Sequence, residues 1–151
     1  MILEVKSDAE MKRFGEKLGA LLRGGEIIEL VGDVGAGKTT FTKGLARGMK
    51  IDEDVQSPSF TISRVYDAPN GLRLAHYDFY RLHNAGIMAD DLRETLGDSI
   101  TVTVIEWAEI VSGVLPEDRL TLLISSTGED DRRVELKADG PISRKLMEQL
   151  V

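Results

Sequence analysis

The chain has 151 residues, 42% of them hydrophobic and 30% charged, which is the balance of an ordinary globular protein. It contains no Cys and only two His, which excludes disulfides, cysteine nucleophiles, thiolate zinc sites and histidine-rich metal sites. Its net charge of −7 argues against tight, direct binding of tRNA or DNA, because contacts to a phosphate backbone require clustered Lys and Arg.

The same features predict a single domain over residues 1–151 that is cytoplasmic and makes no membrane contact. No apolar run approaches the roughly 20 residues that a membrane-spanning helix needs. The apolar residues at the start are interrupted by Glu4, Lys6 and Asp8, which is not the pattern of a signal peptide.

The N-terminal residues predict a strand followed by a helix. Residues 2–5 are a short apolar strand candidate, and Ser7 followed by Glu10 has the spacing of a helix capping box. Apolar residues then recur at helical spacing, at Met11, Phe14, Leu18 and Leu21. We expect the Gly24-Gly25 pair to end this helix.

A second strand and a second helix flank a glycine-rich stretch. Residues 26–31, EIIELV, form a compact strand candidate, and the stretch GDVGAGKT follows it at once. One face of the next helix carries the apolar residues Phe41, Leu45 and Met49. On that helix Gly44 and Gly48 would allow another backbone to approach closely.

The rest of the chain predicts two hairpins, one further strand and two helices. Residues 61–67 and 72–78 alternate on either side of the turn APNG, and LTLLISS and RRVELKA are joined by TGEDD. Between these hairpins, residues 88–96 favour a helix and 99–107 a buried strand. PISRKLMEQL favours a closing helix. We therefore expect an α/β three-layer sandwich with a mixed, largely parallel central sheet and antiparallel hairpins.

The glycine-rich stretch has the pattern G-x-x-x-x-G-K-T between a strand and a helix, which makes the expected fold P-loop NTPase-like. Its backbone N–H groups and the helix N-terminus favour phosphate, Lys38 would reach the β- and γ-phosphates, and the Thr39 hydroxyl would ligate Mg²⁺. The expected nucleotide-binding residues are Gly32, Asp33, Val34, Gly35, Ala36, Gly37, Lys38, Thr39 and Thr40. The guanine-reading pattern N-K-x-D and the switch pattern D-x-x-G do not occur, so ATP is favoured over GTP.

Two carboxylates end predicted strands on otherwise apolar faces. Asp78 follows Leu72, Leu74 and His76 at alternate positions, and Glu106 follows Ile100, Val102 and Val104 in the same way. Because ligands of open α/β sheets bind at the carboxyl ends of the strands, a cation there would explain both acids. We assign Glu106 to the magnesium together with Thr39, and Asp78 to the outer shell of the magnesium or to the attacking water.

Each of these residues also has a purely structural explanation. Asp78 could cap the turn that follows its strand, and Glu106 could pair with an Arg. His76 is favoured as a core residue over a general base, and alternation places Trp107 on the face opposite Glu106, where it would pack in the core. The sequence leaves open whether Trp107 instead contacts a partner or the nucleotide.

Four blocks of sequence together resemble the TsaE (YjeE) family, small bacterial ATPases required for threonylcarbamoyl modification of tRNA adenosine. The blocks occur in order from residue 32 to residue 109: GDVGAGKTTFTKGL, VQSPSFT, HYDFYR and IEWAE. The glycine-rich block is common to many ATPases. H-x-D-x-Y-R followed by I-E-W is far more specific.

The resemblance implies that Lys38, Asp78 and Glu106 are the catalytic residues and that ATP and Mg²⁺ are the cofactors. It implies that Ser57, Pro58 and Thr61 lie in a nucleotide-sensing loop and that Trp107 lies beside the site. An Arg at 132 or 133 could contact the nucleotide. The chain departs from the family at Ala108, where many relatives have Pro, and at Met11, where Thr is frequent.

The resemblance further implies protein partners, a threonylcarbamoyl transferase and its inactive paralogue, with tRNA engaged only through their complex. We therefore expect a Mg-dependent ATPase, slow on its own, that drives or resets this complex. One alternative is a small P-loop kinase acting on a nucleoside or metabolite, although residues 79–98 are a short span for the lid of such an enzyme. Another is a nucleotide-binding adaptor without catalysis.

Overall fold

The computed structural model describes residues 1–33, 35–58, 61–84 and 86–150. Within these ranges the strands form one sheet in the order β1-β7-β6-β2-β5-β4-β3. The strands are β1 (Ile2–Val5), β2 (Ile27–Val31), β3 (Ser63–Asp67), β4 (Arg73–Asp78), β5 (Thr101–Glu106), β6 (Leu120–Ser126) and β7 (Arg132–Ala138). The helices are α1 (Asp8–Gly19), α2 (Lys38–Gly48), α3 (Gly86–Leu96), α4 (Pro141–Gln149) and the 3-10 turn η1 (Ala108–Val111).

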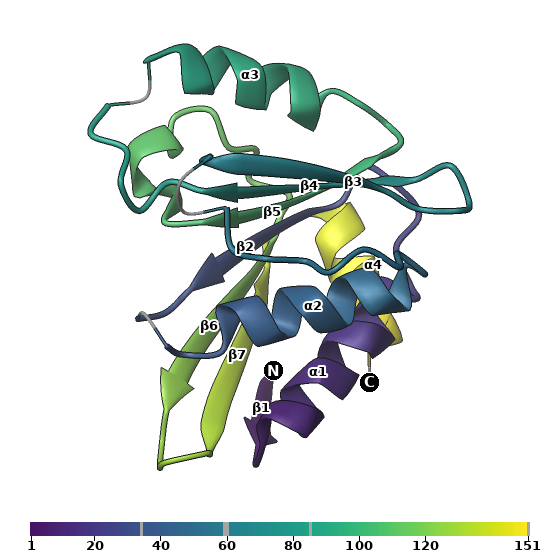
Figure 1. The fold of residues 1–151 in the computed structure, drawn as a ribbon, viewed down its shortest axis with the longest axis vertical. Coiled ribbons are helices and arrows are strands. Elements are labelled where there is room, and N and C mark those ends of the chain that lie inside the picture. Colours follow the sequence, from purple (N-terminus) through teal and green to yellow (C-terminus); the bar gives the residue numbers. More distant parts are fainter. Residues whose placement is uncertain (34, 59–60, 85, 151) are drawn as a thin grey trace.

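The centre of the sheet is parallel and its two edges are antiparallel. Strands β6, β2, β5 and β4 pair in parallel, whereas β3 pairs with β4, β7 with β6 and β1 with β7 in antiparallel fashion. Both predicted hairpins are therefore present, and helices cover the sheet on both sides (Figure 1). This confirms the expected mixed α/β sheet of the P-loop type.

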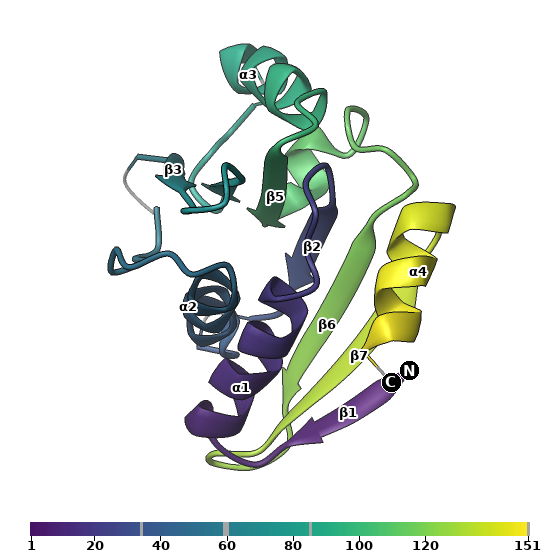
Figure 2. The ribbon, with the colours of Figure 1, turned by 90° about the vertical axis from the view of Figure 1, so that its right-hand side faces the viewer.

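Helices α1 and α2 pack directly on each other beside the sheet (Figure 2). Their contact consists of glycines facing backbone. A Cβ atom built on Gly44 would lie 2.2 Å from the carbonyl oxygen of Lys12, and one on Gly15 would lie 2.4 Å from that of Phe41. The predicted close approach at Gly44 is thus present, and the spacing leaves no room for a larger side chain. Phe41 and Leu45 are fully buried in the core below.

Helix α3 lies on the other side of the sheet from α2 (Figure 1). It is fixed to β4 through Tyr77, whose hydroxyl lies 2.8 Å from the carboxylate of Asp91 and 2.7 Å from the hydroxyl of Thr95. Burial raises the pKa of Tyr77 well above its ordinary value, so the phenol stays protonated and can donate. The sheet therefore separates two apolar cores, one under α1 and α2 and one under α3.

The N-terminus of α1 is capped nearly as the sequence predicts. The hydroxyl of Ser7 accepts a hydrogen bond of 3.1 Å from the backbone N–H of Glu10. The carboxylate of Glu10 accepts in return from Lys6, one residue before the expected position, at 2.7 Å. The helix ends at Gly19, earlier than the expected stop at Gly24-Gly25, and residues 20–25 form turns before β2.

Helix α4 is capped from a distant part of the chain. The carboxylate of Asp118 accepts hydrogen bonds from the backbone N–H groups of Ile142 at 3.0 Å and Ser143 at 2.9 Å. Partial burial opposes ionisation, but these hydrogen bonds and the charge of Arg144 hold the pKa of Asp118 below its usual value. Gly140 precedes the helix, and its missing side chain makes room for this carboxylate.

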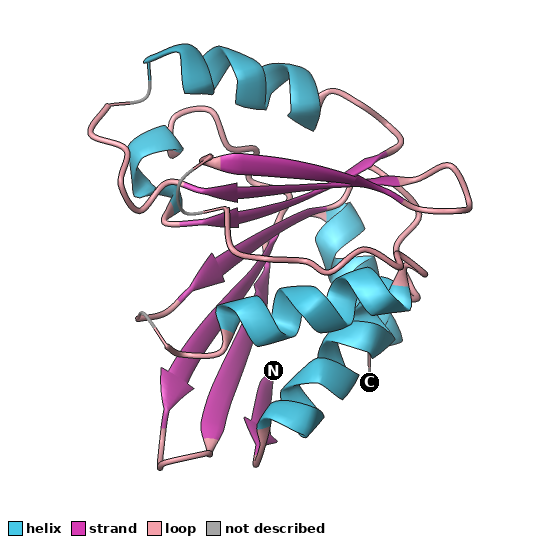
Figure 3. Cartoon of the chain, viewed as in Figure 1, coloured by secondary structure: helices cyan, strands magenta, loops and turns pink. Residues whose placement is uncertain are grey.

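The sheet register brings three strand ends to one edge. Glu106 at the end of β5 is level with Asp78 of β4 and with Leu30 of β2. Gly32 follows β2, so the glycine-rich loop begins at the edge of the sheet where β5 and β4 also end (Figure 3). The expectation that the two acids and the loop meet at the carboxyl edge of the sheet is met.

Candidate functional site: a phosphate loop facing two acids

The glycine-rich loop turns sharply into α2. Gly35 and Gly37 adopt left-handed backbone conformations, with φ of +84° and +106°, which side chains other than glycine rarely tolerate. Helix α2 begins at Lys38, where no side chain of the described residues caps it, and its first turn lines the cleft described below. Val34, one of the expected loop residues, lies outside the described residues.

Lys38 is buried at the first position of α2, with 6% of its surface exposed. Its ammonium donates a hydrogen bond of 2.7 Å to the carbonyl oxygen of Gly32 and lies 3.8 Å from Oε1 of Glu106. It also lies 4.3 Å from the centre of the Trp107 ring, which is within the range of a cation–π contact. The lysine therefore connects the phosphate loop to the end of β5.

Glu106 is the most enclosed of the acids, with 3% of its surface exposed. Its Oε2 lies 2.6 Å from Nε2 of the fully buried His76. A carboxylate at this distance can accept a hydrogen bond from the ring when Nε2 carries its proton. Within the described residues, Nδ1 of His76 has no hydrogen-bond partner. Glu106 is thus held by His76 and Lys38, and the alternative of a pair with Arg is not what the described residues show.

Asp78 lies at the end of the neighbouring strand and uses both carboxylate oxygens. Oδ1 accepts from the backbone N–H of Tyr80 at 3.0 Å, and Oδ2 accepts from the hydroxyl of Ser57 at 3.3 Å. The first contact is the turn cap considered as a structural explanation. The second links the acid to the loop that the resemblance marks as nucleotide-sensing, of which residues 59–60 lie outside the described residues.

Trp107 lies at the bend that follows β5 and contacts both the core under α3 and the cleft. Its backbone is left-handed, with φ of 56° and ψ of 51°, and this reverses the chain immediately after β5. The ring lies beside Lys38, and its centroid is 4.8 Å from that of the exposed Tyr80 ring, with the two ring planes tilted by 48°. The expected packing on the face opposite Glu106 is thus met in part, since the ring lies against the core under α3, but the ring also reaches the cleft because alternation holds only while the backbone remains extended.

These groups surround a cleft of about 460 Å³. The predicted residues that line it are Gly35, Gly37, Lys38, Thr39, Thr40, Ser57, Asp78, Glu106, Trp107 and Arg132. Gly32, Asp33 and Ala36 are loop residues that do not line this cleft. Asp8 also lines the cleft, as do Tyr80 and Arg81 of the HYDFYR block.

The donor set of this cleft suits magnesium. The hydroxyl of Thr39 and the carboxylates of Asp78 and Glu106 offer hard oxygen ligands on its walls. No group of three His, Cys, Asp or Glu side chains that could hold a metal by itself occurs among the described residues. Magnesium commonly takes only one or two protein ligands and completes its shell with phosphates and water, so the site fits the ion as part of a nucleotide complex.

The sheet, the loop and the helix that begins at its lysine define an α/β protein of the P-loop class. The family model described as "Threonylcarbamoyl adenosine biosynthesis protein TsaE" matches residues 5–134. The crystal structure of YdiB from Bacillus subtilis superposes with a TM-score of 0.82 at 33% identity, over 99% of this chain and 93% of that one.

Two relatives carry the same description. The tRNA threonylcarbamoyladenosine biosynthesis protein TsaE of Bacillus subtilis (strain 168) is 37% identical over 146 residues, 93% of this chain and 87% of that protein. The protein so named in Streptomyces coelicolor is 38% identical over 135 residues, 86% of this chain and 91% of that protein. The chain therefore belongs to the TsaE family of tRNA threonylcarbamoyladenosine biosynthesis, as the four sequence blocks predict.

Proposed function

We propose that this protein binds Mg-ATP and hydrolyses it to ADP and phosphate. The observation that carries the proposal is that one cleft is lined by the first turn of α2, which no described side chain caps, by its lysine and by two strand-end acids. Loop amides and Lys38 supply the positive field for the β- and γ-phosphates. Magnesium, when bound, would neutralise part of the phosphate charge and would be held by Thr39 and Glu106.

The two acids receive different roles because their surroundings differ. Glu106 is oriented by a buried histidine and a buried lysine, which suits a group that must hold one position. Asp78 is bonded to the loop hydroxyl of Ser57 and to a backbone amide, so its carboxylate is oriented at the cleft wall. We assign Asp78 to orienting the attacking water or the outer shell of the magnesium.

The activity is proposed to serve a cytoplasmic complex that makes threonylcarbamoyladenosine in tRNA. The partners proposed are a threonylcarbamoyl transferase and its inactive paralogue, which would contact tRNA in place of this acidic chain. Arg81 lines the cleft from an exposed position after β4, and completion of a phosphoryl-transfer site by a partner can raise turnover by several orders of magnitude. We expect slow hydrolysis by the isolated protein and faster hydrolysis in the complex. No helix in the described part of the chain is long and apolar enough to cross a membrane.

The test is the substitution Glu106→Gln, which keeps the size of the side chain and removes its charge. We expect Mg-dependent hydrolysis to fall by roughly 100-fold or more, the scale of a positioned acid, while ATP still binds. Phosphate release measures turnover and calorimetry measures binding. Wild-type turnover in this variant would move the metal role to Asp78.

Two further outcomes separate the alternatives. Thin-layer analysis of labelled ATP with candidate nucleosides and metabolites would reveal a kinase if phosphate appears on an acceptor other than water. Binding without hydrolysis under every condition, the partner complex included, would instead indicate a nucleotide-binding adaptor.

A further inference from the structure

Arg132 connects the phosphate loop to the turn between β6 and β7. Its Nε atom donates to the carbonyl oxygen of Ala36 at 3.2 Å, and its Nη2 atom donates to that of Gly35 at 3.5 Å. On the other side, Nη1 donates to the carbonyl oxygens of Asp131 at 2.9 Å, Glu129 at 3.2 Å and Gly128 at 3.4 Å. One guanidinium group therefore binds backbone oxygens of two loops that are far apart in sequence.

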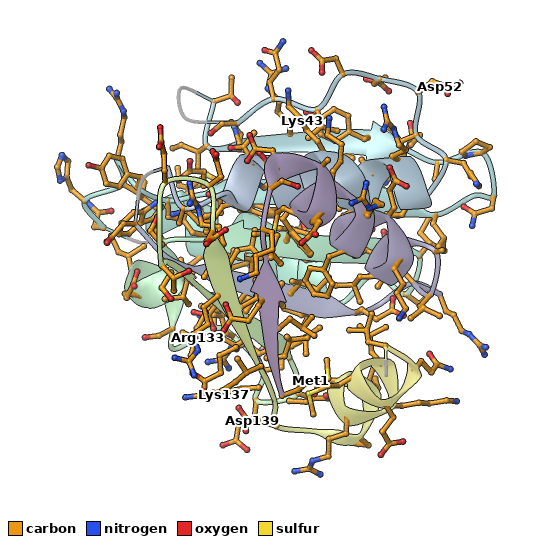
Figure 4. All side chains as sticks on the ribbon, turned by 90° about the horizontal axis from the view of Figure 1, so that it is seen from below. Met1, Lys43, Asp52, Arg133, Lys137 and Asp139 are labelled. Atoms are coloured by element: carbon orange, nitrogen blue, oxygen red, sulfur yellow. The ribbon has the colours of Figure 1, made fainter. Side chains whose placement is uncertain are left out.

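Strand alternation explains why this arginine reaches the loop and its neighbour does not. Arg132 is two residues before Val134 and four before Leu136, so its side chain points to the same face of the sheet as theirs. Val134 and Leu136 are buried in the core beneath α1 and α2. The side chain of Arg133 points to the opposite face of the sheet and is exposed. Figure 4 shows it on the outer surface of the molecule, in the same region as Lys137 of the same strand.

A phosphate loop works only if its N–H groups point at the ligand, which requires its carbonyl groups to point elsewhere. Carbonyl oxygens turned away from the cleft need donors, and a guanidinium group offers several in a rigid plane while remaining charged at every working pH. The contacts of Arg132 with Gly35 and Ala36 meet this need on the side of the loop facing the hairpin.

We propose that Arg132 is a positioning residue that clamps the phosphate loop to the β6–β7 turn and thereby keeps the loop amides directed at the nucleotide phosphates. The inference rests on the proposed function for its consequence, but the clamp itself is a property of the protein alone. It also places a fixed positive charge at the rim of the cleft, where a triphosphate would enter.

The experiment compares Arg132→Ala and Arg132→Lys with the matched control Arg133→Ala in the full chain. Hydrogen exchange without nucleotide reports the loop directly. We expect amides of residues 35–39 to exchange about tenfold faster in Arg132→Ala and at the wild-type rate in Arg133→Ala. Arg132→Lys retains the charge but cannot span both loops, so its exchange should lie between the two.

Calorimetry with Mg-ATP then measures the consequence. We expect the affinity of Arg132→Ala to fall about tenfold or more, the effect of losing one charge-assisted contact, with no change in Arg133→Ala. Unchanged exchange at residues 35–39 in Arg132→Ala, or in Arg132→Lys should the alanine variant not fold, would overturn the clamp. Faster exchange with undiminished ATP affinity would overturn its role in positioning. Absence of ATP binding by the wild-type protein would overturn the proposed function instead, and the exchange result would still decide the clamp.

Discussion

Helices α2 and α4 both begin after a glycine that has no side chain to cap them, yet their N-termini are satisfied in opposite ways. At α4 the carboxylate of Asp118 occupies the first-turn N–H groups, so the protein supplies its own anion. At α2 no side chain among the described residues caps the first turn, and its N–H groups lie at a cleft that two acids also line. A helix N-terminus favours negative charge in both cases, and only the neighbouring residues decide whether that charge is internal or belongs to a ligand.

The largest effect of a substitution is expected at the N-terminus of α2, which lies at the cleft. Lys38→Ala should lower the affinity for Mg-ATP by at least about 100-fold, or about 2.7 kcal/mol, because the ammonium is the strongest positive charge beside the loop amides. Calorimetry measures the affinity, and circular dichroism checks that the variant is folded. Wild-type affinity in this variant would show that α2 does not receive the phosphates.

The matching change at the N-terminus of α4 is Asp118→Ala. It should lower the free energy of unfolding by about 1 to 2 kcal/mol, the range for loss of a helix cap, and leave ATP affinity unchanged. Urea unfolding and calorimetry measure the two quantities on the same preparation. A loss of nucleotide affinity with intact stability would break the distinction between the two helix ends.

Gly140→Ala tests how closely Asp118 approaches α4. The backbone of Gly140 is extended, with φ of −154°, so alanine is tolerated conformationally, but its Cβ atom would lie 2.3 Å from Cγ of Asp118. We expect a cost of about 1 kcal/mol in the wild-type protein, from displacement of the cap. In the Asp118→Ala background the same change should hardly alter the free energy of unfolding, because the crowding carboxylate is gone. Additive effects in this double-mutant cycle would show that a side chain at position 140 does not crowd Asp118.

The smallest effect is a dependence on pH. The pKa of Asp118 is lower in the folded than in the unfolded protein, so the ionised carboxylate contributes stability above the unfolded value of about 4. This contribution is lost as the pH falls through the lower folded value. The stability difference between the wild-type protein and Asp118→Asn should therefore be constant near neutrality and shrink below about pH 4. Unfolding midpoints across this range measure it, and a difference that grows in acid would have the wrong sign.

Local patterns in the sequence predict the glycine-rich loop and the two acids that end their strands. The glycine spacing around Lys38 specifies a loop between strand and helix, and alternation carries Asp78 and Glu106 to the ends of their strands. Parallel strands end at the same edge, so these three elements had to meet. Their assignment to magnesium and to catalysis remains a prediction.

The remaining contacts depend on information that no local pattern contains. Trp107 turns into the cleft because one residue adopts a positive φ, and nothing in IEWAE distinguishes this from a continuing strand. Asp8 reaches the cleft and Asp118 reaches α4 only through the packing of distant elements. The clamp by Arg132 likewise requires the β6–β7 turn to lie beside the phosphate loop, and no local pattern specifies this. The alternation of residues in β7 does predict that the Arg132 side chain points to the core face of the sheet.

The position of Trp107 provides an intrinsic fluorescence signal at the cleft. It is the only Trp in the chain, so intrinsic indole emission comes from one point, and that point is in contact with the ammonium of Lys38 and the ring of Tyr80. A ligand that draws Lys38 away from the indole would change the surroundings of that single emitter. If the proposed nucleotide binds beside this residue, rapid-mixing fluorescence of the unlabelled chain would time its arrival and departure at the millisecond scale.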